Sequence, residues 1–368
     1  MQNKIQINSY QLVIIIIASA LGVSLLELPS YIGEILGSES WIATLAGGVF
    51  ATLSVFLMCL AGKNFESGGL VQSSKNLFGK TIGVILIIPI VISVFIANVV
   101  ELKLFTITVK VFLLDKTPVQ YILMPFLLLV MFLGRGEFKH VIRFLSLVFP
   151  FIIAIILGLS LLTLPGTDFS NLLPVFQKSP LEYLDGASRT MFAVLGILTI
   201  IIMLPYTKKR DFKTNFKTCF LTVLFLTILY TVITILCLAK LGSSETKWIL
   251  YPTVSLIKSA YIPGGFIERL EGALMSIWVV IAFSTVMITL YGLSILLSDI
   301  LNLVNRKLII TIIIPLLHLS CFAASSTFKM LFVSNLNSII LGAYILYILP
   351  IIFIIGYKVK KKRGGCCE

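Results

Sequence analysis

The sequence predicts an all-α integral membrane protein of ten transmembrane helices. Hydrophobic residues make up 58% of the 368 residues and charged residues only 12%, and the mean hydropathy is +1.06. Soluble domains carry about 25% charged residues, so this composition excludes a soluble fold. No polar stretch is long enough to form a separate soluble domain. We therefore expect one permease-like membrane domain over residues 1–368.

Ten apolar runs supply the predicted helices, because about 20 apolar residues are needed to cross a bilayer. In chain order the runs are 10–36, 40–61, 82–114, 118–134, 141–164, 183–206, 216–241, 265–300, 308–324 and 336–356. The third and eighth runs are longer than a bilayer requires, so these two helices are expected to tilt or to project beyond it.

Basic residues in the loops between these runs predict the orientation, because cytoplasmic loops are enriched in Lys and Arg. With the N-terminus in the cytoplasm, the inner loops and tail hold most of them: Lys63, Lys75, Lys80, Arg135, Lys139, Arg143, Lys208, Lys209, Arg210, Lys213, Lys217, Arg306, Lys307, Lys358, Lys360, Lys361, Lys362 and Arg363. The outer loops hold fewer. Both termini are therefore expected inside, and the net charge of +13 is explained by topology rather than by nucleic-acid binding.

The first span is interrupted near its middle. Gly22 favours non-helical geometry, Ser24 competes for backbone hydrogen bonds and Pro29 removes a donor. Glu27 adds a carboxylate that lipid does not accommodate. A broken helix at membrane depth occurs where it is buried in protein or lines a cavity, and transporters bind small molecules at such breaks. We expect Gly22, Val23, Ser24 and Glu27 to bind a ligand. The alternative is a glycine that only permits close helix packing.

The sixth span contains a similar disturbance. Leu195 and Gly196 lie in its middle, and Pro205 closes it before a basic loop. A five-plus-five inverted repeat relates the first span to the sixth, so that both breaks face each other near the midplane. Half-helix ends expose N–H and carbonyl groups of opposite partial charge, which suits a zwitterionic amino acid. For Gly196 a packing role remains the alternative.

The third span carries two polar residues on one helix face. Asn98 and Glu101 are three residues apart and therefore lie side by side. A charged group inside a membrane faces a cavity or a partner. Glu101 is accordingly a second candidate ligand residue, and the alternative is an ion pair with Lys103 or Lys110.

The eighth span adds a hydroxyl-bearing face. Ser284, Ile288 and Tyr291 recur at helical spacing, with Thr285 and Thr289 alongside. Of these, Ser284, Thr285 and Ile288 are the candidates to complete the pocket. Ser and Thr also bond to their own helix backbone, which is the alternative explanation for them.

Neither a cofactor nor a metal site is expected. His140 and His318 lack metal-ligand spacing, and the sequence has no nucleotide-binding loop or G-x-S-x-G elbow. The terminal pair Cys366-Cys367 has no third ligand near it and is interpreted as part of a disordered tail. The sequence therefore predicts a protein that is not an enzyme.

Two stretches resemble a known family. Residues 21–29 read LGVSLLELP, similar to Leu-Gly-x-Gly-Leu-Leu-Thr-Leu-Pro, and Trp41 fits the start of the second helix. Residues 251–272 read YPTVSLIKSAYIPGGFIERLEG, similar to Trp-Pro-Thr-x-Ser-Leu followed by Phe-Ile-Glu-Arg-Phe-Glu. These motifs resemble the spore germination permease family, within the amino acid–polyamine–organocation superfamily. Ser24 replaces a glycine of the family pattern, Glu27 replaces a small polar residue, and Leu198 stands where the sixth helix often carries a Glu.

The resemblance implies a function and partners. Members of this family are B subunits of nutrient germinant receptors with ten helices in a five-plus-five inverted repeat. This chain is then expected to bind a small germinant, an amino acid in the first instance, together with a membrane-anchored A subunit and a lipoprotein C subunit in the spore inner membrane. The alternatives are a proton- or sodium-coupled amino-acid transporter, with Glu27 as proton carrier, and a structural channel subunit whose ligand is sensed elsewhere.

Overall fold

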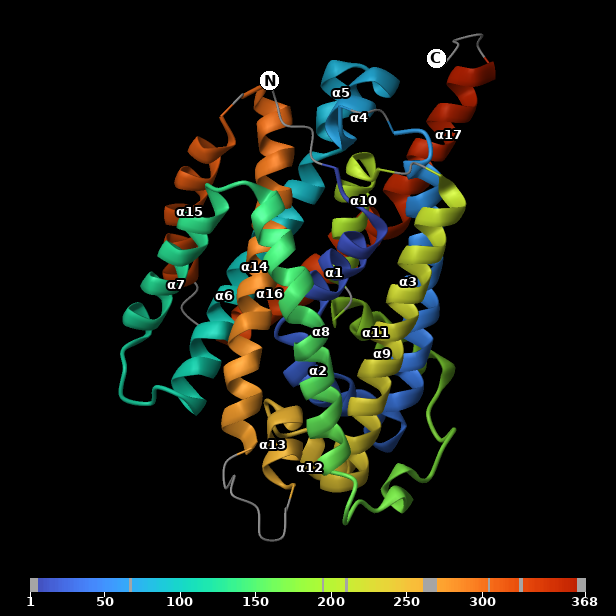
Figure 1. Cartoon of the computed structure of the whole chain (residues 1–368). Coiled ribbons are helices and arrows are strands. Elements are labelled where there is room, and N and C mark those ends of the chain that lie inside the picture. The colour runs from blue at the N-terminus through green and yellow to red at the C-terminus, as the bar shows by residue number, and fades with distance from the viewer. Residues whose placement is uncertain are drawn as a thin grey trace.

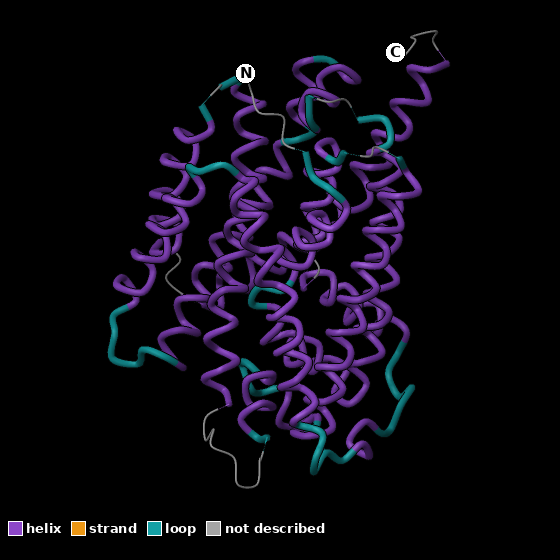
Figure 2. Tube along the Cα trace, in the orientation of Figure 1, coloured by secondary structure: helices purple, strands orange, loops and turns teal. Residues whose placement is uncertain are grey.

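The computed structural model describes residues 6–65, 68–193, 195–208, 211–260, 270–303, 305–323 and 327–362. In these ranges the chain is almost entirely helical, and the one pairing of extended backbone is an isolated bridge between Ile7 and Thr207. The long helices pack side by side into a bundle (Figures 1 and 2). Residues 261–269 of the motif at 251–272 and the Cys366-Cys367 pair fall outside the described residues.

The α-helices follow the predicted order along the chain. Their bounds are α1 Ser9–Ala20, α2 Ser24–Leu36, α3 Ser40–Gly62, α4 Leu70–Phe78, α5 Lys80–Ile85, α6 Ile88–Phe112, α7 Val119–Gly134, α8 Phe138–Leu162, α9 Pro180–Ala193, α10 Thr199–Met203, α11 Phe212–Leu241, α12 Ser243–Thr246, α13 Pro252–Lys258, α14 Leu270–Leu301, α15 Arg306–Ala323, α16 Thr327–Leu336 and α17 Leu349–Lys362. Two π-helical segments, Asn337–Gly342 and Tyr344–Ile348, lie between α16 and α17.

Seven described helical segments are long and apolar enough to cross a membrane, or eight if one bent pair counts as a span. The prediction of ten spans therefore exceeds the number of long helices. The differences have a geometric reason, since α1 has 12 residues and α7 has 16. At about 1.5 Å per residue both are shorter than the roughly 30 Å hydrocarbon core.

Two groups of helices flank α1 and α2 in the bundle (Figure 1). One group is α6, α7, α14 and α15, and the other is α3, α9 and α11. α1 contacts α14 of the first group and α11 of the second, and α2 reaches the short helices α12 and α13 at one end of the molecule. The first span is thus surrounded by protein on several sides, which is where a broken helix is tolerated.

The predicted interruption of the first span is confirmed. α1 ends at Ala20, residues 21–23 form a turn, and α2 begins at Ser24. Pro29 lies inside α2 and cannot donate to the carbonyl of Leu25 four residues earlier. The hydroxyl of Thr253 donates to that carbonyl instead, at 2.8 Å. The helix therefore continues through its proline because another helix supplies the missing donor.

The sixth span is bent where the sequence predicts a disturbance. The segments Pro180–Met191 and Gly196–Tyr206 meet at 56°. Between them the 3₁₀ turn Leu195–Leu198 contacts α1. A Cβ atom built on Gly196 would collide with the backbone carbonyl of Ser19. Only glycine allows the two backbones to approach this closely, so Gly196 has the packing role that was the alternative for it.

Small residues also allow close packing on α3. Gly47 and Gly48 are buried between α9 and α11, and a Cβ atom on Gly48 would collide with the side chain of Thr227. Val49 beside them is 70% exposed at the outer surface of the bundle. Small residues on the buried face and large apolar residues on the outer face are typical of helix packing in membranes, where small residues let backbones approach.

We expect Gly48→Leu to lower the stability of the protein by about 1–3 kcal/mol, because the new side chain overpacks the contact with α11. The midpoint of heat denaturation in detergent, followed by the monodisperse fraction on size exclusion, measures this. Val49→Leu on the same helix is the matched control and should leave the midpoint unchanged. Equal midpoints for the two variants would contradict the close packing of α3 against α11 at Gly48.

Gly196→Ala should be destabilising as well, because the added methyl group meets backbone rather than a movable side chain. Gly158→Ala on α8 is its control, since no atom lies within 4 Å of a Cβ built there. The same denaturation assay should give a lower midpoint for Gly196→Ala than for Gly158→Ala. If Gly196→Ala matched the control, the contact between the 3₁₀ turn and α1 would be wrong.

Candidate functional site

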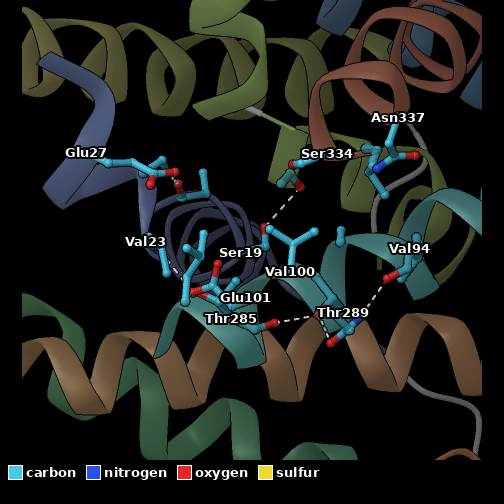
Figure 3. A pocket seen from close by; sticks show the side chains of 18 residues that line it. Ser19, Val23, Glu27, Val94, Val100, Glu101, Thr285, Thr289, Ser334 and Asn337 are labelled. Carbon is cyan, nitrogen blue, oxygen red and sulfur yellow. Dashed lines mark hydrogen bonds between the residues drawn. The ribbon is translucent and has the colours of Figure 1, made fainter. Parts of the chain in front are cut away.

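A cavity of about 70 Å³ lies at the break between α1 and α2 (Figure 3). One water needs roughly 10–15 Å³ of such space, so the cavity has room for several waters or a small ligand. Its walls come from α1, α2, α6, the 3₁₀ turn at Gly196, α14 and the start of the last span. Eight of the eleven candidate ligand residues line it: Gly22, Val23, Ser24, Glu27, Asn98, Glu101, Gly196 and Thr285.

Two other candidates do not line this cavity. The hydroxyl of Ser284 is bonded to the carbonyl of Val280 in its own helix, at 2.6 Å, as the alternative explanation requires. Ile288 is fully buried in the core. The side chain of Leu195, the eleventh candidate, lies outside the described residues.

Four polar residues of the lining were not among the candidates. They are Ser19, Thr289, Ser334 and Asn337. Thr289 follows Thr285 by one helical turn, and Ser334 and Asn337 are three residues apart on the last span. Residues at this spacing lie on one helix face. This spacing is the feature of the sequence from which these lining residues could have been predicted.

The carbonyl groups released by the break are capped by side chains. The hydroxyl of Thr285 donates to Ala18 O at 2.7 Å, and the hydroxyl of Tyr230 donates to Ala20 O at 2.6 Å. The indole N–H of Trp278 donates to Gly22 O at 3.2 Å. The last carbonyls of a helix have no partner within it, so three side chains from α11 and α14 supply the donors.

The amide end of the break is capped by a carboxylate. Val23 N–H donates to Glu101 Oε1 at 3.0 Å, and Figure 3 shows the two residues together. A Cβ atom on Gly22 would lie 2.5 Å from that same oxygen, so the glycine makes room for the carboxylate. An acidic side chain at the start of α2 also suits the positive end of the helix dipole.

Glu101 does not form the ion pair that was the alternative for it. Lys103 instead donates to Cys321 O at 3.1 Å, and the ion pairs formed within the described ranges do not include Lys103 or Lys110. Glu101 therefore faces the cavity.

Glu27 stands between two cavities. Its side chain is 7% exposed and lines both the central cavity and a second one of about 80 Å³. The second cavity is also lined by Ser30, Tyr31, Glu34 and Leu250. None of the three ion pairs found among the described residues involves Glu27 or Glu101. Within the described residues, the cavity thus holds one buried and one partly buried carboxyl group, Glu27 and Glu101, and neither forms an ion pair.

The lining also presents amide groups. Asn98 Nδ2 donates to Val94 O at 2.8 Å, and the hydroxyl of Thr289 lies 3.0 Å from Asn98 Oδ1. Asn337 Nδ2 donates to Ser93 O at 3.3 Å. Asn337 Oδ1 is buried and has no hydrogen-bond partner within the described part of the chain. The lining therefore offers an acceptor that a ligand can use.

Solved structures with a similar fold include a transporter. MHP1, a nucleobase-cation-symport-1 family transporter in a closed conformation with bromovinylhydantoin bound, superposes with a TM-score of 0.70 at 14% identity, over 98% of this chain and 80% of that one. MhsT in complex with L-phenylalanine superposes with a TM-score of 0.67 at 14% identity, over 95% of this chain and 97% of that one. Likeness at this identity shows the fold alone.

Sequence relatives identify the family. GerQB of Bacillus cereus, a spore germination protein, is 26% identical over 361 residues, 97% of this chain and 98% of that protein. Spore germination protein A2 of Bacillus subtilis (strain 168) is 27% identical over 372 residues, 98% of each chain. The sequence profile described as "Spore germination protein" matches residues 6–330. With its apolar helices, the chain is an integral membrane protein that belongs to the spore germination permease family.

Proposed function

We propose that this chain is the B subunit of a nutrient germinant receptor and binds a small germinant, an amino acid or a close derivative, at the broken first helix. The observation that carries the proposal is the central cavity. It lies where the break in the first span meets the bend in the sixth, and the carboxyl groups of Glu27 and Glu101 line it. The membership in the germination family and the small ligands bound in the similar solved structures support the same function.

The proposal includes the ten-helix, five-plus-five inverted repeat within one domain over residues 1–368. α1 with α2 then forms the first span, and α9 with α10 forms the sixth. The short α7 forms the fourth span, and α16 with α17 the tenth. The loop charges orient both termini toward the cytoplasm. The short α7 requires neighbouring helices or local thinning of the bilayer to cover its ends.

The proposed setting is a receptor complex in the spore inner membrane with A and C subunits. The ligand would act by favouring one of two conformations that already exist, which requires different affinities for the two. The chain would act by binding rather than by catalysis.

A coupled amino-acid transporter is the second candidate. The position of Glu27 between two cavities favours it, because a carboxyl group that faces two compartments in turn can carry a proton. Both candidates use the same cavity, so they differ in whether anything crosses the membrane.

Gly22→Leu should abolish the germination response of spores that carry this subunit as their only copy. The leucine side chain occupies the cavity and displaces the carboxyl group of Glu101. Loss of optical density after addition of each of the twenty L-amino acids measures the response, with immunoblots to confirm equal protein. Gly158→Leu, which points into open space on α8, is the matched control. A normal dose response of Gly22→Leu would remove the cavity from ligand recognition.

Reconstituted protein should bind its ligand without concentrating it. Liposomes that contain the chain are tested for uptake of the radiolabelled ligand with and without an inward proton or sodium gradient. Saturable binding without gradient-driven accumulation is the result expected of a receptor subunit. Accumulation that Glu27→Gln abolishes would establish the transporter instead.

A further inference from the structure

We propose that the ligand of the central cavity is a small amine whose carboxyl group is absent or masked, and that Glu101 occupies the position a ligand carboxylate would take. This inference rests on the proposed function, because it names the ligand class of the same cavity. It replaces the zwitterionic ligand that the sequence favours. Three features of the cavity lead to it.

The first feature is the occupied amide end of α2. A ligand carboxylate at a broken helix needs a free N–H group and the positive end of the helix dipole. Here Glu101 Oε1 accepts from Val23 N–H at 3.0 Å and lies against Gly22. A second carboxylate at this point would meet the first at close range. The protein thus carries its own substitute for the acid group of a ligand.

The second feature is the occupied carbonyl end of α1. Ala18 O, Ala20 O and Gly22 O each accept from a side chain of the protein. These are the carbonyl groups that a ligand ammonium would otherwise contact. These three backbone carbonyl groups therefore already have hydrogen-bond donors. The ligand is recognised mainly by the side chains that line the cavity.

The third feature is the chemistry of those side chains. Glu27 is 7% exposed, Glu101 is partly buried beside the break, and no cation pairs with either among the described residues. Asn337 Oδ1 is a buried acceptor to which no donor of the described ranges bonds. Carboxylates and amide oxygens accept hydrogen bonds, whereas an ammonium group donates three. A buried carboxylate is costly unless it is paired, so a cationic donor is the complement of this cavity.

The size of the cavity limits the rest of the ligand. A volume of about 70 Å³ and walls that include Ala20, Ala97 and Gly196 leave room for a short side chain only. Val94, Val100 and Leu104 make part of the lining apolar. The expected ligand is a short aliphatic amine or the amide of a small amino acid.

Matched probes test the ligand class on the purified full-length protein. Isothermal titration in detergent compares L-alanine, L-alaninamide, N-acetyl-L-alanine and isopropylamine, with the corresponding valine series alongside. We expect the amide and the amine to bind about tenfold or more tightly than the free acid, because all three carry an ammonium group but the carboxylate of the free acid would lie against Glu101. N-acetyl-L-alanine, which has an acid and no amine, should not bind.

Variants of Glu101 separate its charge from its hydrogen bond. Glu101→Gln retains an acceptor for Val23 N–H but loses the charge, and should weaken binding of L-alaninamide about tenfold. Glu101→Ala frees the amide end of α2 and should reverse the preference, so that L-alanine binds more tightly than L-alaninamide. Glu245→Gln, an exposed glutamate on α12, is the matched control and should behave as the unaltered protein.

The outcomes distinguish this inference from the proposed function. If L-alanine or L-valine binds more tightly than its amide to the unaltered protein, and Glu101→Gln leaves this unchanged, the ligand class is overturned while the receptor function stands. If no probe binds and Gly22→Leu spores respond normally, both fall. Should Glu101→Ala fail to fold, Glu101→Gln and the probe series still decide the question.

Discussion

The cavity depends on one constraint, which is that backbone groups inside a membrane protein must find partners without water. The break at residues 21–23 releases the carbonyl groups at the end of α1 and an amide group at the start of α2. Each unsatisfied group would cost several kcal/mol in hydrocarbon. Thr285, Tyr230 and Trp278 satisfy the carbonyl groups and Glu101 satisfies the amide. Through these hydrogen bonds, α6, α11 and α14 each contact the break in the first span.

The same constraint explains part of the family motif in residues 251–272. Pro29 leaves the carbonyl of Leu25 without its helical donor, and Thr253 supplies one. The hydroxyl groups of Tyr251 and Thr108 lie 2.7 Å apart, which connects α13 to α6. The first residues of the motif therefore hold α2 at the end of the molecule where α12 and α13 lie. A shift of α2 would alter the hydrogen bond from Thr253.

Much of the architecture could be predicted from hydropathy and from chain-breaking residues. Regular apolar runs such as 40–61 and 216–241 agree with α3 and α11 to within a few residues. The run 118–134 likewise agrees with α7, whereas the run 82–114 is divided at Leu86–Ile87 between α5 and α6. Local composition records how apolar a segment is, but not where packing allows the backbone to turn.

The candidate site, too, was partly predictable from the sequence and partly decided by the packing of the helices. The chain by itself determined a membrane protein of the germination family whose first helix is broken at Gly22, because hydropathy, glycine and proline act locally. Only the tertiary structure decided that Glu101, 78 residues away from Val23, caps this break. It likewise decided that Ser284 and Ile288 do not line the cavity while Asn337 does. Such meetings depend on how each helix is rotated and placed against its neighbours, which helical spacing in one segment does not specify.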